Sequence, residues 1–129
     1  MILMTRTRTN EEWLNDLSGG GAAQESAVAD LQAILLRAVL YTFNRNLSEL
    51  SSLARDDTIR LAEDCSQDAL IAIMNHFLDF RGDSKFTTWA YKFAINVALT
   101  AARRERWRGV SLDQLSSAED SALFERSML

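Results

Sequence analysis

The sequence contains no proline, one cysteine, one histidine and only five glycines among its 129 residues. Average proline usage of about 5% would give roughly six prolines, and their absence favours long, uninterrupted helices. The single cysteine, Cys65, cannot form a disulfide within the chain, so no residue requires an oxidising compartment. No apolar run approaches the roughly 20 residues that span a bilayer. We therefore expect a cytoplasmic protein without membrane insertion.

Residues that could support catalysis are also scarce. His76 has no second histidine or cysteine at the spacing of metal ligands. The three consecutive glycines, 19–21, lack the lysine and serine of a phosphate-binding loop, and no strand pattern precedes them. Cys65 falls within an amphipathic segment, where we expect a small buried side chain. We therefore expect a protein that is not an enzyme and that binds no metal or cofactor.

Apolar residues recur at helical spacing along most of the chain, which predicts an all-α fold, a compact bundle of about four helices. A capping box at Thr9 predicts a short first helix that ends at the glycine triplet. The periodicity then predicts three long helices, over residues 22–44, 57–80 and 86–108. The segment 47–57 is either a short helix or an irregular turn. These elements divide the chain into an N-terminal helix with its glycine loop (1–21), a helical domain (22–108) and a short acidic linker or tail (109–129).

The charges are unevenly distributed. The formal net charge of −4 argues against nucleic-acid binding, because nucleic-acid-binding domains are usually basic. Residues 1–80 carry a net charge of −6 and residues 109–129 a net charge of −3, whereas residues 81–108 carry +5 from seven basic and two acidic side chains. The acidic total therefore conceals one basic element, which consists of the fourth predicted helix and the loop before it.

One face of that helix combines cations with an aromatic ring. At about 100° per residue, the following side chains share one stripe: Lys85, Trp89, Lys92, Asn96, Thr100 and Arg103. The core should receive the neighbouring arc of Phe86, Ala90, Phe93, Ala94, Val97 and Ala101. Cations that follow phosphates, with an aromatic plane that stacks on an unpaired base, suit single-stranded nucleic acid. The alternative is a solvated face whose basic end complements the helix dipole.

The third predicted helix has the opposite character. Its first turns carry Glu63, Asp64, Gln67 and Asp68, and the apolar residues Ile71 and Met74 follow on the same side. An acidic patch with apolar neighbours can dock a basic partner helix. Acidic residues near a helix start are also favourable for the helix dipole, so this pattern alone leaves both interpretations open.

Two segments together resemble a known family. Residues 61–70 (LAEDCSQDAL) and 80–96 (FRGDSKFTTWAYKFAIN) are similar to region 2 of bacterial extracytoplasmic-function sigma factors, which belong to the sigma-70 superfamily. The resemblance covers roughly residues 55–108, and its most specific part is the phrase from Phe80 to Asn96. It implies a sigma factor domain that binds core RNA polymerase and recognises and melts the minus-ten promoter element.

The resemblance also implies roles for individual residues. Asp64, Gln67 and Asp68 would contact the clamp helices of the largest polymerase subunit, with Ile71 and Met74 beside them. The loop that captures a flipped base of the non-template strand would comprise Phe80, Arg81, Gly82, Asp83, Ser84, Lys85 and Phe86. Trp89, Lys92 and Asn96 would hold the melted strand. The phosphates near the upstream duplex edge would be met by Arg103, Arg104, Arg106 and Arg108.

Family members also carry a second helical domain for the minus-thirty-five element. The chain ends about 20 residues after the fourth predicted helix, so we expect an excised domain or a truncated factor. An anti-sigma factor is a further expected partner. The alternative function is a helical module that binds or sequesters a transcription regulator without reading DNA, and such a module need not retain Trp89, Lys92 and Asn96.

Overall fold

The computed structural model describes residues 7–108, which form four α-helices and two short 3₁₀-helices, with no strand in that range. In chain order the elements are α1 (Asn10–Gly19), α2 (Gly21–Arg45), η1 (Leu47–Leu50), α3 (Arg55–His76), η2 (Phe77–Asp79) and α4 (Phe86–Arg108). The predicted all-α fold with four main helices is confirmed. The predicted acidic tail, 109–129, lies outside the described residues, as do residues 1–6.

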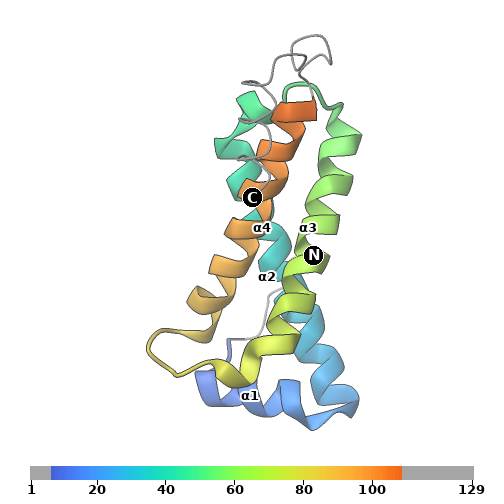
Figure 1. Ribbon diagram of the computed structural model, residues 1–129. Helices are drawn as coiled ribbons and strands as arrows, with labels where there is room; N and C mark the ends of the chain where they lie inside the picture. The colour runs from blue at the N-terminus through green and yellow to red at the C-terminus, as the bar shows by residue number, and fades with distance from the viewer. Residues whose placement is uncertain (1–6, 109–129) are drawn as a thin grey trace.

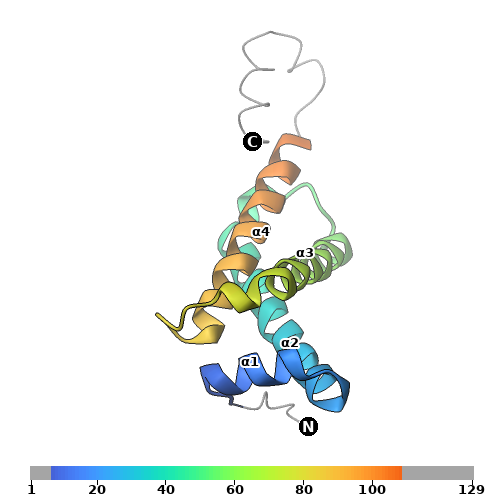
Figure 2. The same ribbon diagram turned by 60° about the horizontal axis from the view of Figure 1, so that its bottom comes forward.

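The three long helices pack against one another, and α1 lies across one end of them (Figure 1). α2 contacts both α3 and α4, and α3 also contacts α4. At the opposite end of the bundle, η1 packs against α4. The turned view shows α1 beneath the loop that joins η2 to α4 (Figure 2). The loop with the predicted base contacts therefore lies at the α1 end of the molecule.

Small side chains on α4 allow its close approach to the other helices. Ala90, Ala94, Ala98 and Ala102 recur every four residues and have no exposed surface. Phe93, Val97 and Ala101, which we predicted to face the core, are only half-buried. These three residues pack against the edge of the core, and Phe86, Ala90 and Ala94 are fully buried, as predicted. The buried face also includes Ala98 and Ala102, which were not predicted, because small side chains allow close packing between helices.

α1 is fixed to α2 by a buried arginine. The Arg8 guanidinium donates to Asp16 at 2.9 Å and to Asp30 at 2.5 Å, and its side chain is 1% exposed. It also lies 4.8 Å from the Trp13 ring centroid. Burial acts to lower the pKa of Arg8, but the hydrogen bonds and charges of the two aspartates outweigh it and raise the pKa above its usual value. The predicted capping box is present, since Thr9 and Glu12 exchange side-chain-to-backbone hydrogen bonds of 3.1 and 3.2 Å.

The third helix is shorter than predicted at its C-terminal end. α3 ends at His76, the chain tightens into η2, and Phe80 is extended. Phe80 therefore belongs to the loop, where its ring contacts those of Phe86 and Trp89.

α2 is the one helix in residues 7–108 that is long and apolar enough to cross a membrane, although no such segment was predicted. Core helices of bundles meet the same criterion. Leu31, Leu35 and Val39 of α2 are fully buried in the core that α2 shares with the other helices, which accounts for its apolar character.

Candidate nucleic-acid and protein interfaces

The basic stripe on the fourth helix lies on the surface of the protein. We call the set Lys85, Trp89, Lys92, Asn96, Thr100 and Arg103 the α4 strip. All of its members are exposed except Trp89, which is half-buried. The strip thus presents cations, an amide and a hydroxyl to solvent along several turns of α4. These are the groups that follow a phosphate backbone and hydrogen-bond to base edges.

Trp89 belongs to an aromatic cluster at the start of α4. Its ring centroid lies 5.4 Å from that of Phe80, 5.5 Å from that of Phe86 and 4.8 Å from that of Phe93. These contacts fix the indole while part of it remains accessible. A ring held in place by its neighbours loses little entropy when a base stacks on it.

Phe86 requires a correction. Its side chain has no exposed surface and stacks on Trp13 of α1 at a centroid distance of 5.3 Å. The side chain therefore cannot make the DNA contact that we predicted for it. As the first residue of α4, Phe86 instead anchors the end of the loop in the core.

The capture loop, which we define as residues 81–85, is mostly solvent-exposed. Four of its five residues are exposed and Ser84 is half-buried. Gly82 has a φ of +82°, a conformation that other residues adopt at a cost.

An α1 side chain holds the last part of this loop. The Asn10 amide donates from Nδ2 to the Ser84 carbonyl at 2.9 Å and accepts at Oδ1 from the Phe86 N–H at 2.7 Å. The sequence did not predict this role for Asn10. Asparagine is an ordinary residue at the start of a helix, so its neighbours in the sequence give no sign of a second role. The contact joins residues more than 70 positions apart, and local sequence patterns do not predict such contacts.

The four arginines near the end of α4 differ in their surroundings. Arg106 lies 3.8 Å from Glu49 of η1, and Arg108 lies 3.2 Å from Glu105. Arg103 and Arg104 are exposed and have no ion pair within residues 7–108. Arg103 and Arg104 are therefore the more available of the four for a phosphate, although exposed ion pairs are weak enough to exchange partners.

The predicted protein-docking residues also share one surface. We call Asp64, Gln67, Asp68, Ile71 and Met74 the α3 patch. Asp64, Gln67 and Asp68 are exposed, Ile71 is 53% exposed and Met74 is half-buried. The Gln67 Oε1 accepts from Nε2 of Gln32 on α2 at 2.6 Å, which orients this side chain.

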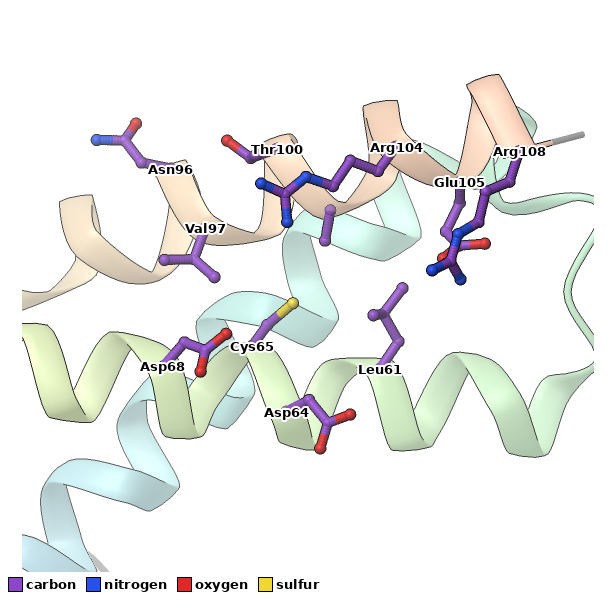
Figure 3. Close-up of a pocket in the computed structure, with 11 residues that line it drawn as sticks. Leu61, Asp64, Cys65, Asp68, Asn96, Val97, Thr100, Arg104, Glu105 and Arg108 are labelled. Carbon is purple, nitrogen blue, oxygen red and sulfur yellow. The ribbon is translucent and has the colours of Figure 1, made fainter. Parts of the chain in front are cut away.

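A groove of about 590 Å³ separates the α3 patch from the α4 strip (Figure 3). Asp64 and Asp68 line it from α3, and Asn96, Thr100 and Arg104 line it from α4. Cys65 is buried at this groove, as predicted. Burial, followed by the charges of Asp68 and Asp64, raises the pKa of its thiol to about 11, with Arg104 opposing. The two predicted interfaces are therefore neighbours of opposite charge.

No metal centre competes with this interpretation in the part of the chain that the structure describes. No group of three or more histidine, cysteine, aspartate or glutamate side chains could hold an ion there. His76 is exposed, and its Nδ1 lies 3.3 Å from the Asp79 carboxylate.

Comparison with known proteins decides the family. Residues 33–108 match the family model of sigma-70 region 2. The chain belongs to the sigma-70 region 2 family. The matched range of this sigma-70 region 2 domain contains the whole α3 patch, the capture loop and the α4 strip, while α1 lies outside it.

A curated relative is the RNA polymerase sigma-H factor of Pseudomonas aeruginosa, which is 41% identical over 66 residues. That similarity covers 50% of this chain and 32% of the relative, so the chain matches about a third of the relative's length. No solved structure matches the chain.

Proposed function

We propose that this chain is a sigma factor domain that binds core RNA polymerase through the α3 patch and reads the minus-ten promoter element with the capture loop and the α4 strip. The observation that carries the proposal is that both candidate surfaces lie within the range that matches the family. The range that matches sigma-70 region 2 contains two exposed surfaces of opposite charge on neighbouring helices.

The α3 patch suits a basic helical partner, for which we propose the clamp helices of the largest polymerase subunit. The Asp64 and Asp68 carboxylates would steer the encounter and fix its register. Ile71 is half-exposed and adjoins the half-buried Met74, so it supplies apolar surface for the centre of an interface.

The α4 strip suits an unpaired strand, for which we propose the non-template strand of the melted minus-ten element. Lys92 and Arg103 would follow its phosphates, and Trp89 would stack on a base. Extraction of a base from the duplex costs a few kcal/mol of stacking and pairing free energy. The capture loop would offset this cost by binding the extracted base. Bond formation in RNA synthesis remains the task of the polymerase.

The acidic remainder of the chain supports a dependence of DNA binding on the polymerase. Residues 1–80 carry a net charge of −6 and repel DNA in general. We therefore expect weak DNA binding by the free chain and tighter binding once the polymerase places α4 beside the strand. Assignment to the extracytoplasmic-function subclass, action in the cytoplasm and control by an anti-sigma factor are parts of the same proposal.

The polymerase half of the proposal is tested by pull-down with purified core RNA polymerase. Asp64→Arg reverses one charge of the α3 patch and should reduce capture at least fivefold. Glu25→Arg makes the same charge change at an exposed site on α2 and should leave capture unchanged. Equal capture of both variants and the wild type would refute the interface.

The DNA half is tested by selection from a randomised pool of single strands with the polymerase-bound chain. We expect one short motif to be enriched. An unenriched pool, together with normal polymerase capture, would favour the alternative of a docking module that does not read DNA.

A further inference from the structure

One side chain outside the matched range connects α1 to the capture loop. Asn10, the first residue of α1, is half-buried and uses both ends of its amide on the segment between the loop and α4. It donates to the Ser84 carbonyl at 2.9 Å and accepts from the Phe86 N–H at 2.7 Å. Both are good hydrogen-bond distances.

Asn10 supplies a hydrogen-bond partner to a backbone group that α4 itself cannot satisfy. The first four N–H groups of a helix have no carbonyl partner within it, and Phe86 supplies the first of these in α4. Asn10 therefore caps α4 from another helix. The same amide also holds the carbonyl of Ser84, whose own hydroxyl donates to the neighbouring Lys85 carbonyl at 3.1 Å.

α1 is held in place by contacts on either side of Asn10. The buried Arg8 holds it to Asp30 of α2, and the capping box at Thr9 fixes its first turn. Trp13, one turn after Asn10, stacks on Phe86 at 5.3 Å between centroids. The amide and the indole thus hold the same end of the loop by a polar and an apolar contact.

We propose that Asn10 is a positioning residue for base capture, because it holds the capture loop in its binding conformation before DNA arrives. This inference rests on the proposed function of the loop. A loop that is already ordered loses less conformational entropy on binding than a loop that must become ordered. The Asn10 amide is engaged by backbone groups of Ser84 and Phe86, so it should affect discrimination between bases without touching DNA.

The test uses the full chain bound to core RNA polymerase and two labelled strands, namely the strand selected by the wild type and a scrambled version of it. Asn10→Ala should lower the ratio of the two affinities by about tenfold, the effect expected from two lost hydrogen bonds. Asn15→Ala is the matched control, because it makes the same side-chain change at an exposed position of α1 and leaves the capping box and the Asn10 amide intact. It should change the ratio less than about twofold.

Two further measurements separate positioning from general stability. Asn10→Ala should accelerate amide hydrogen exchange in residues 81–86 but leave polymerase capture through α3 unchanged. Asn10→Asp retains an acceptor for the Phe86 N–H and loses the donor to Ser84, so it should lower the ratio even if Asn10→Ala fails to fold.

An unchanged affinity ratio in Asn10→Asp, or in a folded Asn10→Ala, would overturn the inference and leave the proposed function intact. An equal loss of affinity for both strands and for polymerase would also overturn it, because this pattern indicates a structural role alone. If the wild type itself does not distinguish the strands, the proposed base reading fails and the inference fails with it.

Discussion

Replacement of Arg103 and Arg104 by alanine removes the two cations near the end of α4 that have no ion pair in residues 7–108. Lys85, Lys92 and Arg103 belong to the α4 strip and Arg104 is next to Arg103, so four exposed cations lie on or beside the proposed path of the strand. Each phosphate contact on a single strand adds about −0.7 to the slope of log affinity against log salt, so four contacts give about −2.8. The double variant should therefore show about −1.4.

The two slopes predict clearly different salt sensitivities. From 50 to 200 mM salt, the wild type should lose affinity about fiftyfold and the double variant about sevenfold. The assay is fluorescence anisotropy of the labelled selected strand, with the chain bound to core polymerase and the salt series run in parallel.

The matched control removes a cation from a different face. Arg60 on α3 is exposed and lies 3.9 Å from Asp57, outside the α4 strip. Arg60→Ala should leave the slope unchanged. Equal slopes for the wild type and the double variant would refute the proposed strand path. An equal reduction by Arg60→Ala would also refute it, because the effect would then reflect total charge alone.

Three further predictions concern the loop, the core and α1. Gly82→Ala should destabilise the protein by about 1 kcal/mol in urea unfolding, because φ is +82° and the space around a new Cβ is open, so only backbone strain opposes it; an unchanged midpoint would contradict this. Cys65 should react slowly with Ellman's reagent at pH 8, since a pKa of about 11 leaves about a hundredfold less thiolate than the ordinary value of 9.0. Because the folded-state pKa is the higher one, the free energy of unfolding should fall as pH rises from about 9 to 11; rapid labelling of the native protein would contradict the burial. Arg8→Ala should cost about 2 kcal/mol in urea unfolding, less than for a fully buried pair because the Asp16 and Asp30 side chains are 24% and 25% exposed; a loss below about 0.5 kcal/mol would show that the arginine does not hold α1.

Apolar periodicity predicted the helices well because burial of one face dominates their stability. α4 begins at Phe86 and ends at Arg108, as predicted. The same signal correctly placed Phe86, Ala90 and Ala94 on the buried face of α4 but missed Ala98 and Ala102. Large residues such as Phe93 dominate a hydrophobic pattern, whereas Ala98 and Ala102 are buried more completely because they lie where the helices come closest.

The candidate site was predictable where its residues are neighbours in the sequence. The residues of the α4 strip, and those of the α3 patch, recur every three or four positions. Helical geometry alone therefore places the members of each set on one face. Contacts between distant segments were not predictable. The Asn10 amide and the Trp13 ring lie on α1, and only the packing of α1 against α2 and α4 brings them to the loop.

The most direct test of the central claim is the ratio of affinities of the polymerase-bound wild-type chain for the selected strand and for its scrambled version. The proposed base reading predicts at least a tenfold preference for the selected strand at constant salt, since strands of equal length and composition carry the same phosphate charge. Equal affinities would contradict the claim and would limit α4 to non-specific contact with the DNA backbone.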